Sequence, residues 1–227
     1  MRVRLAAVLG VAVLVTAILV AAGRLGADDA EITAATSPAV PSLFAGIQQA
    51  GAVLGSPDAP VTLVEYADLQ CPFCAQWSRD ALPTLVEDHV RTGDLRIVFN
   101  GMAFLGPDSD KALRTALAAG RQNHLWDVVH GLYANQGVEN AGWVTDELVS
   151  GIAGDVPSLD GQKVFALRFG SSIGTELAAA AETATAAGIH STPSFQLGPT
   201  GGALELVQVS SLGPEGIVPA VEEALAR

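Results

Sequence analysis

Along this chain, stretches in which apolar residues recur at helical spacing alternate with short apolar runs typical of strands. The points where one pattern gives way to the other mark the expected helices and strands. Val61–Ala67 is almost continuously apolar, which is typical of a strand covered on both faces of a sheet. The next apolar residues recur at helical spacing, with Pro83 expected to kink this helix and Gly93 to end it. Leu95–Phe99 then returns to strand character, which completes a β-α-β unit with a right-handed crossover.

From about residue 105 to residue 187 only helical periodicity is found, so the pattern predicts a helical segment inserted between strands. The expected helices are Asp108–Ala119, His124–Ala134, Thr145–Ala153, Gly161–Phe169 and Ser172–Ala187. Strand character returns at Ser194–Leu197 and Leu204–Val207, and the Gly- and Pro-rich turn between them indicates a hairpin. Pro214–Ala226 is predicted to be a closing helix, so the expected fold class is α/β.

The N-terminal residues carry a separate pattern. Residues 1–4 include two arginines and precede the uncharged apolar run Leu5–Ala22. Its length lies between a cleaved signal core and a comfortable membrane span, so residues 5–23 are either an uncleaved anchor or a signal peptide. Either way the arginines stay in the cytoplasm and the rest is exported. Residues 24–50 are predicted to be a flexible linker, and residues 51–227 a single domain.

The charge balance narrows the expected partners. Without the two N-terminal arginines, 10 of the 12 Lys and Arg residues remain against 24 Asp and Glu, a net charge of −14. Nucleic acid is therefore not an expected partner, because its phosphates are bound by basic surfaces. The acidity is interpreted as a solubility feature of the surface.

Cys71 and Cys74 are the only cysteines, and they lie where the first strand passes into the first helix. A disulfide that closes so short a loop removes little entropy from the unfolded chain, so a structural role explains the pair poorly. Cys71 lies at the expected helix N-terminus, where free N–H groups and the helix dipole stabilise a thiolate. Pro72 suits the first helical turn. Cys74, one turn further, is the expected resolving thiol.

The sequence leaves other interpretations of these residues open. An inert disulfide and a metal half-site both compete with a redox-active dithiol, although structural zinc requires four ligands and the chain has no second cysteine pair. His190 is a further candidate ligand for a copper or zinc site. Glu65 interrupts the buried strand before the cysteines. If it is buried, its pKa is raised and it could exchange a proton with Cys74; otherwise it is a strand-end glutamate that faces water.

Glu65, the Cys71–Cys74 motif, the helical insertion and the segment Gly188–Phe195 together resemble the DsbA-like branch of the thioredoxin superfamily. The similarity is greatest to its membrane-tethered, extracytoplasmic bacterial members, and it extends from Gly51 to the C-terminus. It implies a thioredoxin-like fold with an inserted helical subdomain at about residues 105–187.

The resemblance also implies roles for individual residues. The four catalytic positions are Cys71 as exposed nucleophile, Cys74 as its buried partner, Glu65 as buried acid and Pro193 as a cis-proline facing the disulfide. The backbone at Thr192 is expected to pair with an extended client peptide, and Pro72 and Phe73 to contact the client. Phe73 occupies the position where the best-known oxidants of the family carry His, and it offers no charge to stabilise a thiolate.

The expected function is that of an exported thiol-disulfide oxidoreductase that introduces disulfides into unfolded or reduced exported proteins through Cys71 and Cys74. No other cofactor is expected, and a membrane quinone-linked thiol oxidase is the expected partner for re-oxidation. The expected location is the cell membrane, or outside it if the signal is cleaved. A reductase or isomerase of the same fold is one alternative. A non-enzymatic binding module or metallochaperone that uses His190 with the two cysteines is another.

Overall fold

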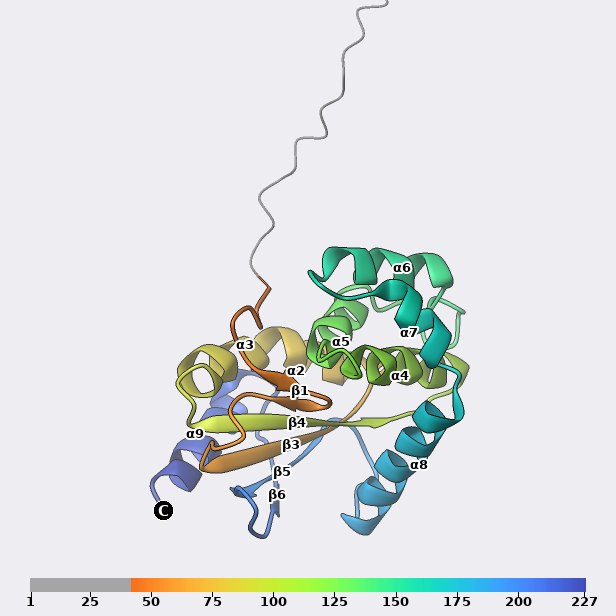
Figure 1. The fold of residues 1–227 in the computed structure, drawn as a ribbon. Coiled ribbons are helices and arrows are strands. Elements are labelled where there is room, and N and C mark those ends of the chain that lie inside the picture. Colours follow the sequence, from red (N-terminus) through yellow and green to blue (C-terminus); the bar gives the residue numbers. More distant parts are fainter. Residues whose placement is uncertain (1–41) are drawn as a thin grey trace, which may run out of the picture. The chain divides into compact units, whose positions relative to one another are not determined.

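The computed structural model describes residues 42–227; the predicted segments 1–4 and 5–23, and most of the predicted linker, lie outside them. The described residues form a six-stranded sheet in the order β1-β2-β4-β3-β5-β6, with helices on both faces (Figure 1). The strands are β1 Gln49–Ala50, β2 Val53–Leu54, β3 Val61–Asp68, β4 Leu95–Met102, β5 Ser194–Pro199 and β6 Glu205–Val207. The helices are α2 Pro72–Asp80, α3 Leu82–Leu85, the π-helical η1 Val86–Val90, α4 Pro107–Gly120, α5 Leu125–Ala134, α6 Asp146–Asp155, α7 Gly161–Leu167, α8 Ser171–Ala186 and α9 Pro214–Leu225.

Strand β3 lies at the centre of the sheet, parallel to β4 and antiparallel to β5. All of its residues are buried, which confirms the prediction of a strand covered on both faces. Leu63 and Ala67 belong to the main core, whereas Val64 and Tyr66 belong to a second cluster that α8 covers. Because side chains alternate along a strand, Glu65 points to the main-core side, where α2 packs.

Helices α2 and α3 and the η1 turn form the crossover from β3 to β4, which confirms the predicted β-α-β unit. The predicted kink is a break at Ala81, between α2 and α3. Pro83 lies in the first turn of α3, where its missing N–H costs no hydrogen bond. Gly93 follows η1 with a φ of 89°, a left-handed conformation that glycine adopts without strain.

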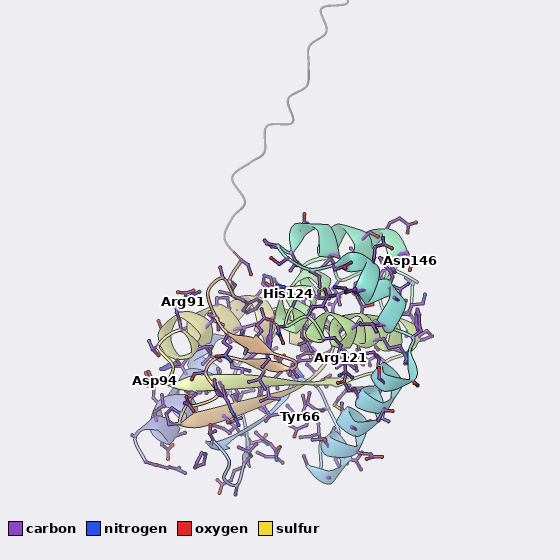
Figure 2. All side chains as sticks on the ribbon, in the orientation of Figure 1. Tyr66, Arg91, Asp94, Arg121, His124 and Asp146 are labelled. Atoms are coloured by element: carbon purple, nitrogen blue, oxygen red, sulfur yellow. The ribbon has the colours of Figure 1, made fainter. Side chains whose placement is uncertain are left out.

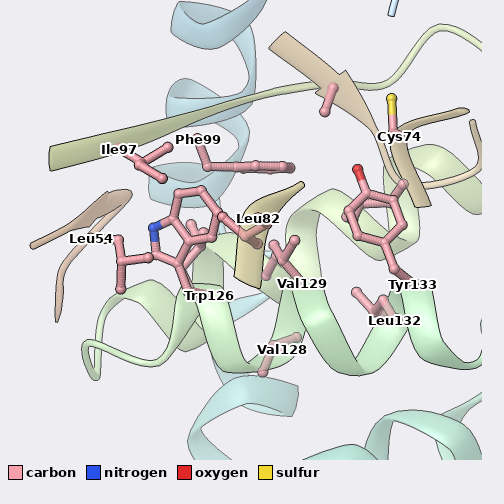
Figure 3. Packing of buried hydrophobic residues seen from close by; sticks show 14 of the residues in the cluster. Leu54, Cys74, Leu82, Ile97, Phe99, Trp126, Val128, Val129, Leu132 and Tyr133 are labelled. Carbon is pink, nitrogen blue, oxygen red and sulfur yellow. The ribbon is translucent and has the colours of Figure 1, made fainter. Parts of the chain in front are cut away.

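The inserted helices α4 to α8 lie between β4 and β5 in the chain, as predicted, and they share the core of the sheet. Trp126 of α5 packs against Phe99 of β4, with ring centroids 5.9 Å apart (Figure 3). It also packs against Phe44, at 6.1 Å. Its indole N–H donates to the carbonyl of Ala52 at 3.0 Å. The insert is therefore continuous with the sheet in its packing.

The folded unit begins earlier than the predicted boundary at Gly51. Phe44 is only 3% exposed, and the two-residue strands β1 and β2 add an antiparallel edge to β4. The carboxylate of Asp127 in α5 accepts hydrogen bonds from Ser42 and Gln49, both at 2.8 Å. The described end of the predicted linker is thus packed on the insert; strands of two residues leave no periodic pattern by which it could be predicted.

Charged side chains lie at the rim of the described fold, where Figure 2 labels Arg91, Asp94 and Asp146. Arg91 pairs with Glu87 at 2.9 Å, but such an exposed pair contributes only about 0–1 kcal/mol because water screens it. The stability of the fold therefore comes mainly from its buried core. Within residues 42–227, no helix combines the length and the apolar sequence that a membrane span requires.

Candidate active site

Cys71 lies at the N-cap of α2, with φ −72° and ψ 120°, and Pro72 occupies the first helical turn as predicted. Both Cys71 and Cys74 carry free thiols. Cys74 is fully buried, as expected. Cys71 differs from the expectation of an exposed nucleophile, since only 5% of it is accessible. The Cys71 sulfur can therefore be reached only from a restricted direction.

The loop before β5 covers part of Cys71. The peptide bond between Thr192 and Pro193 is cis, as the resemblance implied. The thiol of Cys71 donates a hydrogen bond to the carbonyl oxygen of Thr192 at 3.4 Å. The structure thus brings the two separated parts of the predicted site together, although they are 121 residues apart in the chain.

The two thiols have opposite acidities. The pKa of Cys71 is lowered to about 6, mainly by a hydrogen bond with the Cys74 thiol, against the effect of burial. The side chain of Thr192 lowers this pKa further. The amides of Phe73 and Cys74 add the smallest contributions, since neither reaches the sulfur in full N-cap hydrogen-bond geometry. Burial and the nearby Cys71 sulfur raise the pKa of Cys74. Near neutral pH the pair is therefore a thiolate at Cys71 and a thiol at Cys74.

Glu65 is buried, with 1% of its surface accessible, so the alternative of a strand-end glutamate facing water is wrong. Burial raises the pKa of its carboxyl to about 8. Its Oε1 atom has no hydrogen-bond partner. A charge on Glu65 also raises the pKa of Cys74, so the two groups interact. This carboxyl is chiefly neutral at pH 7 and has a free oxygen with which to exchange a proton.

Tyr133 is a member of the site that the sequence analysis missed. It lies on α5, is 2% exposed, and donates its hydroxyl hydrogen to the carbonyl of Asp68 at 3.4 Å. Its pKa is raised well above the usual value, first by burial and then by Cys74 and Glu65. Figure 3 shows the hydroxyl on the side of the ring that faces Cys74. The insert therefore supplies a polar group to the surroundings of the buried Cys74 thiol.

Asp68, the last residue of β3, was also missed, and it joins the strand to the start of the insert. Its side chain is fully buried and accepts four hydrogen bonds. The donors are the amide of Gln70 at 2.9 Å, the hydroxyl of Ser109 at 2.6 Å, and the amides of Phe104 and Leu105 at 3.1 and 3.2 Å. This carboxylate fixes the end of β3. The loop that starts there, residues 69–71, connects β3 to α2 and is called the cysteine loop below.

Residues 48–200 match the family model described as Thioredoxin. The chain belongs to the thioredoxin family. Over 103 residues this thioredoxin-family chain is 32% identical to "Disulfide bond formation protein D" of Bacillus subtilis. That match covers 44% of the chain and 46% of the relative, and the chain spans about half the length of the curated relatives it matches.

Solved structures show that this thioredoxin-family fold is DsbA-like. The oxidised BdbD of Bacillus subtilis superposes with a TM-score of 0.68 at 21% identity, covering 79% of this chain and 97% of BdbD. The alpha-DsbA1 of Wolbachia pipientis superposes with a TM-score of 0.64 at 18% identity, covering 77% of this chain and 90% of that structure. At these identities the similarity establishes the fold alone.

Three other residues that the sequence analysis singled out, Pro72, Phe73 and His190, lie at the surface of this DsbA-like fold. Pro72 and Phe73 are exposed, and 59% of the Phe73 surface is accessible. His190 is exposed as well. Within residues 42–227 there is no group of three or more His, Cys, Asp or Glu side chains that could hold a metal ion.

Replacing Glu65 by glutamine should remove a pH dependence from the stability of the oxidised protein. The folded-state pKa of about 8 lies above the ordinary value of 4.5, so between these values the unfolded chain has lost a proton that the folded protein keeps. Stability therefore falls as pH rises through this window, by up to about 1.4 kcal/mol per pH unit. Glutamine does not ionise, so we expect a flatter profile in Glu65→Gln.

The measurement is the free energy of unfolding of the oxidised protein, in which the cysteines do not titrate, across this pH range. Glu182→Gln on the exposed face of α8 is the matched control, and it should keep the wild-type slope. An unchanged slope in Glu65→Gln would show that Glu65 does not titrate as described.

Proposed function

We propose that this chain is an extracytoplasmic thiol-disulfide oxidoreductase that introduces disulfides into exported proteins. The observation that carries the proposal is the pairing of a low pKa at Cys71 with a raised pKa at the buried Cys74. A stable thiolate at Cys71 stabilises the reduced form of the pair relative to its disulfide. A protein whose reduced form is stabilised in this way is a strong oxidant. The name of the Bacillus subtilis relative supports the same chemistry.

In the proposed reaction the protein begins with a Cys71–Cys74 disulfide. A client thiolate attacks the sulfur of Cys71, which forms a mixed disulfide and releases Cys74 as a thiolate. The neutral carboxyl of Glu65 supplies the proton that the buried Cys74 requires. A second client thiolate then attacks the client sulfur of the mixed disulfide and releases Cys71 as a thiolate. Two electrons pass from the client to the protein, and the client gains one disulfide.

The lowered pKa of Cys71 favours electron transfer from the client to the protein, and the size of this effect depends on pH. The folded value of about 6 lies below the ordinary value of 9, so ionisation stabilises the reduced protein increasingly as pH rises from 6 towards 9. The stabilisation is lost as pH falls through 6. At pH 7 it amounts to about 1 kcal/mol once solvent screening is allowed for, which corresponds to a shift of about 20 mV towards a more oxidising potential.

The surface around Cys71 supports an unfolded client. Phe73 lies beside the nucleophile and Phe104 follows β4, with 59% and 52% of their surfaces accessible. The amide of Phe104 is bound to the Asp68 side chain, which places this residue near the cysteine loop. Exposed aromatic side chains of this kind bind apolar segments that a folded client would bury. We propose that such a segment also pairs with the backbone of Thr192 by β-strand addition.

Re-oxidation and location complete the proposal. A protein that gives up its disulfide must recover it, and we propose a membrane quinone-linked thiol oxidase as the electron acceptor. The uncharged run Leu5–Ala22 supports attachment to the membrane by a single segment, with the catalytic domain outside the cytoplasm.

The deciding experiment is the reduction potential of the Cys71–Cys74 pair in glutathione buffers. Trp77 is a suitable fluorescent reporter because it is fully buried on α2 and packs against Phe195, with ring centroids 5.0 Å apart. We expect a value of about −120 to −180 mV, the range of disulfide oxidases and isomerases. A value near about −270 mV would overturn the proposed direction and indicate a reductase.

A further inference from the structure

A side-chain amide of the helical insert binds two backbone carbonyls of the loop between β3 and α2. Gln136 follows the end of α5, where its backbone N–H donates to the carbonyl of Tyr133 at 3.3 Å. Its side-chain nitrogen, Nε2, donates to the carbonyl of Leu69 at 2.9 Å and to the carbonyl of Cys71 at 3.2 Å. The insert thus contacts the backbone of the nucleophile itself.

The carbonyl oxygen of Cys71 accepts two hydrogen bonds, one from Gln136 and one from α2 itself. From α2 it accepts the first hydrogen bond of the helix, donated by the amide of Ala75 at 3.2 Å. Its direction is set by the ψ angle of Cys71, which is 120°, the extended value of an N-cap residue. A second donor on this oxygen opposes rotation about ψ and keeps Cys71 at the N-cap. The same restraint fixes the direction of the Cα–Cβ bond of Cys71, from which Sγ reaches the carbonyl of Thr192.

We propose that Gln136 is a positioning residue, which acts from the helical insert to hold Cys71 at the N-cap of α2 with its sulfur in the reactive orientation. Gln136 does not touch the sulfur, so it acts only through the backbone of Cys71 and Leu69. The inference rests on the proposed role of Cys71 as nucleophile, and it holds for either direction of electron flow.

The chain offers a matched control for this glutamine. Gln122 also lies in the insert and makes two hydrogen bonds to loop backbone, from Nε2 to the carbonyl of Asp160 and from the amide of Asp160 to Oε1, both at 3.1 Å. Gln136→Met and Gln122→Met each keep the length of the side chain and remove two such bonds. Only Gln136→Met removes a contact to the cysteine loop.

The experiment measures the rate at which iodoacetamide alkylates the reduced full-length chain as a function of pH. We expect Gln136→Met to move the midpoint of the Cys71 reaction upward, and to slow alkylation about threefold to tenfold below the wild-type midpoint, because each pKa unit changes the thiolate fraction there about tenfold. Gln122→Met should keep the wild-type midpoint. Gln136→Asn retains the amide on a shorter stem that does not reach both carbonyls, and it carries the test if the methionine variant does not fold.

An unchanged midpoint in folded Gln136→Met or Gln136→Asn would overturn the inference, whatever the loss of stability. An equal shift in Gln122→Met would also overturn it, because the effect would then not depend on the cysteine loop. If the wild-type chain itself reacted at the midpoint of an ordinary cysteine, the proposed function would fail together with the inference, and this result is distinguishable from the other two.

Discussion

Replacing Cys71 by serine will abolish disulfide transfer to a reduced, unfolded client. A serine hydroxyl forms no disulfide, and it is not ionised at neutral pH. Cys74 cannot take over the reaction, because it is fully buried and its pKa is raised by burial. The measurement is the rate at which the disulfide form of the full chain oxidises the thiols of the client. Retention of wild-type activity in Cys71→Ser would contradict the assignment of the nucleophile.

The companion variant Cys74→Ser separates the roles of the two thiols. It keeps the sulfur of Cys71, which is the less buried of the two, so it should still form a mixed disulfide with an activated client, and without the resolving thiol this species should accumulate. A non-reducing gel distinguishes the two variants directly. Mixed disulfide in Cys71→Ser and none in Cys74→Ser would reverse the assignment.

Replacing Asp68 by alanine should lower the free energy of unfolding by about 3–5 kcal/mol. The carboxylate is fully buried, and its removal leaves two backbone amides at Phe104 and Leu105, the amide of Gln70 and the hydroxyl of Ser109 without their acceptor. Each buried donor that loses its partner retains its desolvation cost. The check is a denaturant titration in which the midpoint falls while the slope stays constant.

Asp110→Ala is the matched control for this substitution. Asp110 is a partly exposed carboxylate on α4 that pairs with Arg114 at 2.7 Å, and loss of such a pair should cost only about 0–1 kcal/mol. Asp68→Asn should fall between the two alanine variants, since it keeps one acceptor oxygen. If Asp68→Ala were as stable as Asp110→Ala, the four hydrogen bonds would not contribute as described.

The elements that the sequence predicted well are those with a local signal. Strand β3 has an almost continuous apolar run, and α2 begins with a proline after a cysteine, so both could be located from neighbouring residues alone. The burial of Glu65 was open at that level. It is decided by the position of β3 between β4 and β5, which is a property of the whole sheet.

The contacts that the sequence did not predict join distant parts of the chain. Asp68 is 41 residues from Ser109 and 65 from Tyr133, and Gln136 is 67 residues from Leu69. A tyrosine or glutamine at the end of a predicted helix has no pattern that distinguishes an active-site role from an ordinary surface or core position. The low exposure of Cys71 was missed for the same reason, since Thr192 reaches it from far along the chain.

The contact between Cys71 and Thr192 also affects how the chain behaves while it is being made. During synthesis Cys71 emerges 121 residues before Thr192, so until β5 has joined the sheet it lacks the Thr192 side chain, one of the groups that lower its pKa. In a partly synthesised chain the pKa of Cys71 is therefore higher than in the finished fold. Cys71 reaches its full reactivity only when the last part of its site has joined the sheet.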